Sequence, residues 1–69
     1  MSDHKVVGKI GRVTGAVRPG VVGEVVIPVR GSSEAFLARS DHDEPLAVGT
    51  RIVVIEHLPP RTVIVAPIA

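Results

Sequence analysis

Gly15-Ala16-Val17-Arg18-Pro19-Gly20-Val21-Val22-Gly23 is the stretch of the chain that decides the fold. Its centre has the chemistry of a tight turn, because Pro19 presets φ at about −65° and Gly20 tolerates the positive φ of a type II turn. Gly15 and Gly23 lie on either side, at positions where a strand bends sharply or another backbone comes close. The stretch therefore predicts a joint between two strands that curl toward each other.

Valine-rich runs lie on both sides of this joint. Residues 6–14 predict a first strand, and Gly8 and Gly11 within it indicate a bulge or a tight barrel bend. Residues 21–30 predict the second and longest strand. Since Pro28 has no N–H to donate to a ladder, we expect an unpaired or bulged segment there.

Three more strands follow, at residues 35–40, 51–56 and 62–66. Residues 31–34 predict a short hairpin connection, and residues 40–50 are too short and too rich in Pro and Gly for a helix. Pro59-Pro60 cannot continue a strand, so the last two strands should form a hairpin.

Five short strands separated by turn signals are typical of a small all-β barrel. We expect a five-stranded OB-type barrel without the usual helix between the third and fourth strands. Residues 6–69 should form this single OB-fold barrel domain, and residues 1–5 a flexible N-terminal segment.

Composition narrows the function classes. The 69 residues contain no cysteine, which removes disulfides, thiolate chemistry and cysteine metal sites. Eight basic residues nearly balance seven acidic ones and are spread singly along the chain, so the electrostatic case for nucleic acid or anionic lipid is weak. No apolar run approaches the roughly 20 residues that span a bilayer, and we expect a soluble chain without direct membrane insertion.

Strand periodicity divides the apolar residues between two faces. The expected barrel interior consists of Val25, Ile27, Val29, Phe36, Ala38, Ile52, Val54, Val63 and Val65. The alternate positions then point outward, and clustered outward aliphatics would mark a protein–protein surface. The candidate interaction residues are Val26, Leu37, Val53, Ile55 and Ile64, with Arg18 and Arg39 as rim charges.

Five segments also occur in this order and spacing in a known family. Gly8-Lys9-Ile10-Gly11 precedes Arg18-Pro19-Gly20 with Gly23, a Phe36-Leu37-Ala38-Arg39-Ser40 strand follows, and residues 48–54 and 63–67 close the domain. Together they resemble the C-terminal soluble domain of the NfeD family of membrane proteins. The resemblance extends from about Val7 to Ile68.

This resemblance implies an OB-fold module that follows transmembrane helices on the same polypeptide, on the cytoplasmic side of the membrane. It also implies a role in membrane-protein quality control, with partners of the stomatin or flotillin type. A non-catalytic interaction module is therefore the preferred hypothesis, with a membrane-protein partner or self-association. The serine protease domain of some longer relatives is not present in these residues.

Other chemistry has weaker support. Asp41, His42, Asp43 and Glu44 would hold a divalent cation only loosely, and a solvated acidic loop is the simpler interpretation. Ser40, His42 and Asp43 lie almost adjacent on a loop and cannot adopt the geometry of a catalytic triad. The sequence predicts no metal, no cofactor and no enzymatic activity.

The alternative function is a single-stranded nucleic-acid-binding OB module. Such binding uses aromatic stacking platforms beside a basic groove. Phe36 is the only aromatic residue, and we expect it inside the barrel. Nucleic acid is therefore the less favoured partner.

Overall fold

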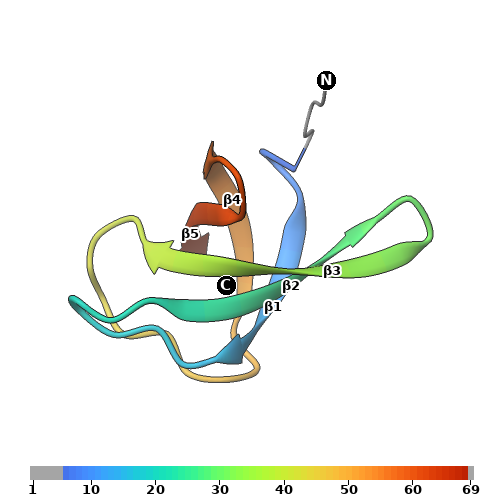
Figure 1. Ribbon diagram of the computed structural model, residues 1–69. Coiled ribbons are helices and arrows are strands. Elements are labelled where there is room, and N and C mark those ends of the chain that lie inside the picture. The colour runs from blue at the N-terminus through green and yellow to red at the C-terminus, as the bar shows by residue number, and fades with distance from the viewer. Residues whose placement is uncertain (1–5, 69) are drawn as a thin grey trace.

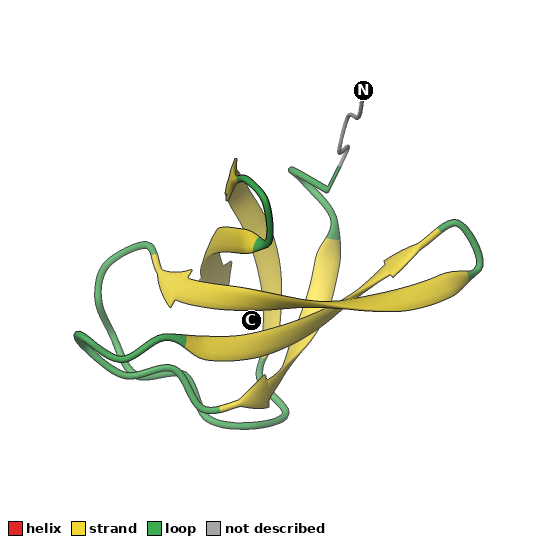
Figure 2. Cartoon of the chain, viewed as in Figure 1, coloured by secondary structure: helices red, strands yellow, loops and turns green. Residues whose placement is uncertain are grey.

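A computed structural model of the protein describes residues 6–68, and this part of the chain contains five strands and no helix (Figures 1 and 2). The strands are β1 (Ile10–Gly15), β2 (Gly23–Val29), β3 (Ser32–Ser40), β4 (Arg51–Leu58) and β5 (Thr62–Pro67). The predicted flexible segment, residues 1–5, lies outside the described residues.

The strands close into a barrel in the order β1-β2-β3-β5-β4, because β4 pairs back with β1. All neighbours are antiparallel except β3 and β5, which are parallel. Residues 41–50 connect β3 to β4 without a helix. The prediction of an OB-type barrel without a helix at this place is confirmed.

The glycine-rich joint has the predicted turn at its centre. Gly20 has φ of 75°, and the Val21 N–H donates to the Arg18 carbonyl oxygen at 2.8 Å. At Gly23 an added Cβ would collide with the carbonyl oxygens of Gly15 and Ala16. Glycine is therefore required at position 23 for the close approach that lets β1 and β2 curl together.

The β2–β3 hairpin differs from the prediction. Arg30 and Gly31 form a two-residue turn with φ of 52° and 81°, and β3 begins directly after it at Ser32. The predicted connection over residues 31–34 was wrong, because a type I′ turn needs positive φ at both central residues and arginine is an unusual choice there.

Pro28 lies in a segment of β2 that pairs with β3 but not with β1. The pairing of β1 with β2 ends at Arg12 opposite Val26, whereas β2 pairs with β3 as far as Val29 opposite Ser32. Pro28 therefore occupies a segment that β1 leaves unpaired, as predicted. The β2–β3 hairpin extends beyond the barrel here (Figure 1).

The core fills the barrel and contains only apolar residues among those described. Eight of the nine predicted interior side chains are buried, and Val29 is half-buried against them. Val6, Val13, Val17 and Leu46 complete the core. Val17 and Leu46 exchange two backbone hydrogen bonds, at 3.0 and 2.8 Å, and so join the β1–β2 loop to the β3–β4 loop at one end of the barrel.

Candidate protein-interaction surface

The five aliphatic side chains expected to point outward lie on the outer face of the barrel. Leu37 is 49% exposed and Ile55 is 45% exposed. Val26, Val53 and Ile64 are half-buried. Strand alternation accounts for these positions, because each residue neighbours a buried one in the chain.

Barrel closure distributes these side chains around the circumference. Val53 lies opposite Ile10 on β1 and Ala66 on β5. Val26 on β2 lies opposite Arg12 on β1 and Ala35 on β3, so β1 separates it from Val53 on β4. Leu37 lies opposite Thr62 on β5, and Ile64 lies opposite Arg39 on β3, so these two side chains belong to the neighbouring strands β3 and β5.

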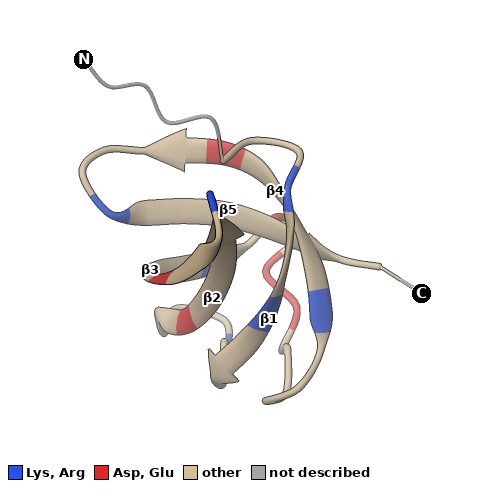
Figure 3. Ribbon diagram, turned by 90° about the vertical axis from the view of Figure 1, so that its right-hand side faces the viewer, with Lys and Arg blue, Asp and Glu red and all other residues tan. Residues whose placement is uncertain are grey.

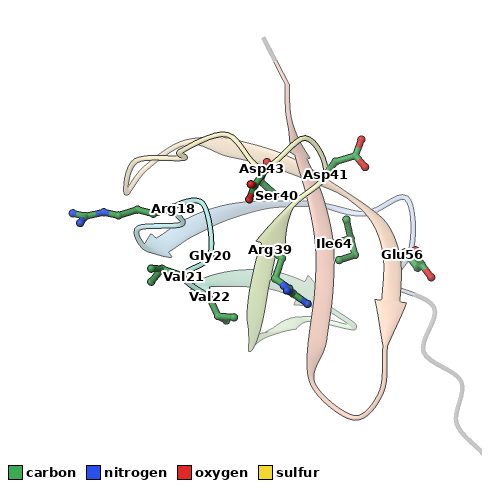
Figure 4. Close-up of a pocket in the computed structure, with 10 residues that line it drawn as sticks. All are labelled: Arg18, Gly20, Val21, Val22, Arg39, Ser40, Asp41, Asp43, Glu56 and Ile64. Carbon is green, nitrogen blue, oxygen red and sulfur yellow. The ribbon is translucent and has the colours of Figure 1, made fainter.

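A groove of about 380 Å³ brings together part of the predicted set. Residues of the β1–β2 loop form one wall, and residues at the end of β3, in the following loop, on β4 and on β5 form the rest (Figure 4). Arg39 and Ile64 lie side by side, because they are directly paired in the parallel β3–β5 ladder. Arg18 also lines the groove and extends away from the barrel.

Two valines of the joint belong to this groove but were not predicted as surface residues. Val21 is 55% exposed and Val22 is 45% exposed, and both line the groove. The sequence analysis assigned them to the second strand, whereas β2 begins only at Gly23. Their place directly after Gly20, in a turn, was the signal that could have found them.

The groove carries charges of both signs. Arg18 and Arg39 line it together with Asp41, Asp43 and Glu56. None of these arginines forms an ion pair within residues 6–68, where the one ion pair joins His42 Nδ1 to Asp41 Oδ2 at 3.5 Å. The arginines are therefore available to a carboxylate of a partner, in the forked geometry that guanidinium favours.

The acidic loop beside the groove has the geometry of a turn. Ser40 Oγ accepts a hydrogen bond from the Glu44 N–H at 3.0 Å, so this serine caps the turn. No group of three or more His, Asp or Glu side chains in residues 6–68 is arranged to hold a metal ion.

Phe36 is buried and packed by two neighbours at the barrel end. His57 meets its ring edge-to-face at a centroid distance of 6.1 Å, and the Arg61 guanidinium lies 5.5 Å from the ring centroid. Arg61 also donates to the Ala35 carbonyl oxygen at 2.9 Å. The ring is buried inside the barrel, as predicted. It therefore offers no stacking surface to a nucleic-acid base.

Comparison with known proteins agrees with this architecture. Residues 10–66 match the model of the NfeD C-terminal domain family. The chain belongs to this family. The match includes every strand apart from the last residue of β5. A search of curated proteins gives no match.

Two solved NfeD-type structures are similar. The soluble domain of the NfeD protein YuaF from Bacillus subtilis is 30% identical, with a TM-score of 0.75 over 87% of this chain and 70% of that chain. The C-terminal domain of stomatin operon partner protein 1510-C from Pyrococcus horikoshii is 25% identical, with a TM-score of 0.79 over 100% of this chain and 97% of that chain. Within residues 6–68 of the present NfeD domain, no helix is long and apolar enough to cross a membrane.

Proposed function

We propose that this NfeD domain is a non-catalytic protein–protein interaction module that binds its partner across the groove between the β1–β2 loop and the β3–β5 pair. We call this surface the groove face; it consists of the groove residues Arg18, Val21, Val22, Arg39 and Ile64, together with Leu37, which adjoins the groove two residues before Arg39 on the outward face of β3. The supporting observation is the close association of exposed aliphatic side chains with two arginines that have no ion-pair partner in the described chain.

The exposed aliphatics of the groove face supply a modest driving force. Val21, Val22 and Leu37 each expose about half of their surface. Burying the exposed part of each would stabilise a complex by roughly 1 kcal/mol, before the entropic cost of association is subtracted. Such a surface suits a weak, regulated contact, or one strengthened by several copies acting together.

The partner class follows from the family. One similar structure is named as a stomatin operon partner protein, and we extend that association to this chain. The partner is then a membrane protein of stomatin or flotillin type, or a second copy of the NfeD domain. In the parent protein the domain would lie on the cytoplasmic side of the membrane and contribute to membrane-protein quality control.

A double variant tests the groove face. Val22→Glu with Leu37→Glu places two charges on it at positions that are already exposed, so the barrel should still fold. We expect binding to a purified stomatin-type protein, and any self-association in analytical ultracentrifugation, to be lost. Val48→Glu is the matched control, because Val48 is 64% exposed and lies in the β3–β4 loop, outside the groove face.

Circular dichroism establishes that each variant remains folded. Wild-type binding and self-association in a folded Val22→Glu/Leu37→Glu protein would refute the groove face. Equal losses in the double variant and in Val48→Glu would also refute it, because the effect would then not depend on position.

A further inference from the structure

The face formed by β1 and β4 contains two arginines in direct opposition. Arg12 and Arg51 are cross-strand partners, and the blue segments of β1 and β4 in Figure 3 lie next to each other. Both side chains are exposed, and neither makes an ion pair within residues 6–68. Like charges on directly opposed residues destabilise a sheet. Within residues 6–68, no ion pair of either arginine offsets this repulsion.

Aliphatic groups surround this pair. A shallow hollow of about 250 Å³ is lined by both arginines together with Ile10, Val26 and Pro28. Ile10 is 47% exposed, and Val53 lies opposite it on β4. Lys9, directly before β1, adds a third exposed cation. Glu24 lies on the outer face of β2, but its carboxylate accepts a hydrogen bond from Thr14 Oγ1 at 2.9 Å. Within the described chain, it forms no ion pair with these cations.

We propose that this basic–aliphatic face binds the phosphate groups of anionic phospholipids at a membrane surface. We define it by Lys9, Ile10, Arg12, Arg51 and Val53. The guanidinium group of arginine forms bidentate hydrogen bonds with phosphate oxygens. Aliphatic side chains next to cations can enter the boundary between lipid headgroups and acyl chains. An anionic surface would relieve the repulsion between the two guanidinium groups.

Other anionic partners fit the face less well. A nucleic acid would need aromatic side chains for stacking, and the only aromatic residue is packed at the end of the barrel. An acidic protein segment would pair with the arginines but would leave the exposed aliphatic side chain of Ile10 without a matching apolar contact. A flat array of cations and aliphatics favours a lipid surface instead.

Vesicle co-sedimentation tests the proposal with the full 69-residue chain. Vesicles of phosphatidylcholine mixed with phosphatidylglycerol should bind the protein, and vesicles of phosphatidylcholine alone should not. Each basic residue near an anionic surface contributes a factor of about five in partition. Arg12→Gln with Arg51→Gln should therefore weaken binding about 30-fold, and raising the salt concentration should weaken it in wild type.

Arg18→Gln with Arg39→Gln removes the same charge from the groove face. It should lower binding to the protein partner and leave vesicle binding at the wild-type level. The groove-face proposal and the lipid proposal can therefore be refuted independently of each other. Equal vesicle binding by wild type and Arg12→Gln/Arg51→Gln would overturn the lipid proposal. Binding of single-stranded DNA or an acidic peptide that depends on these arginines, without vesicle binding, would overturn it as well.

Discussion

Gly23→Ala should be the most damaging of the glycine-to-alanine substitutions in the joint. The added methyl group would meet the Gly15 carbonyl oxygen, the Ala16 carbonyl oxygen at 2.6 Å and the Val17 Cγ2 at 2.6 Å. Two of these atoms are backbone, and the Val17 side chain is itself 1% exposed, so none of them can move away cheaply. Overpacking of this kind costs about 3 kcal/mol, at the upper end of the usual range.

That loss is large for so small a domain. Native domains are stabilised by about 0.05–0.15 kcal/mol per residue, which gives roughly 3–10 kcal/mol for 69 residues. Urea unfolding followed by far-ultraviolet circular dichroism is the suitable assay, because the chain has no Trp or Tyr for fluorescence. With a slope of about 1 kcal/mol per molar urea, the midpoint should fall by about 3 M, or the protein should be unfolded in buffer.

Two other glycines serve as controls. At Gly20 a Cβ would meet no atom within 4 Å, and only the positive φ opposes alanine, at a cost of about 1 kcal/mol. At Gly15 the nearest atom, Glu24 Cβ, lies 3.2 Å away and belongs to an exposed side chain. If Gly23→Ala were no less stable than Gly20→Ala, close backbone approach would not explain the glycine at position 23.

Three further substitutions have expected outcomes in the same urea assay. Arg30→Asn should stabilise the domain by about 0.5–1 kcal/mol, because asparagine tolerates the positive φ of the hairpin turn; an unchanged midpoint would contradict this assignment. Arg61→Ala should cost about 1 kcal/mol, since it removes the contact with Phe36 and the hydrogen bond to Ala35, and Arg61→Lys should recover little of it. Ile52→Val should cost about 1 kcal/mol, because Ile52 is 0% exposed and the lost methyl group leaves a cavity; a neutral result would mean that the core relaxes around this position.

Periodicity predicted the barrel interior because each strand alternates faces independently of its neighbours. Val25, Ile27, Ile52 and Val54 are buried for this reason. Val17 and Leu46 were beyond such reasoning, because they lie in loops and are brought together by a two-residue bridge that no local pattern encodes.

The proposed interaction surface was only partly predictable for a related reason. Alternation identifies which side chains point outward, but lateral neighbours depend on the order of strands around the barrel. Arg39 and Ile64 meet because β3 and β5 pair in parallel, although β4 lies between them in the chain. Likewise, Arg12 and Arg51 are far apart in sequence, so the scattered charges gave little sign of a basic face.

Closure of the barrel makes its two chain ends interdependent. The first strand is held by the fourth as well as the second, and the last strand is held by the third as well as the fourth. Because Ile10 pairs with Val53 and Leu37 pairs with Thr62, the structure needs contacts that span most of the chain. Such a topology is expected to fold slowly for its size, and a domain this small normally folds in one cooperative step. A cell that makes this domain therefore has no closed barrel until the last strand has been synthesised.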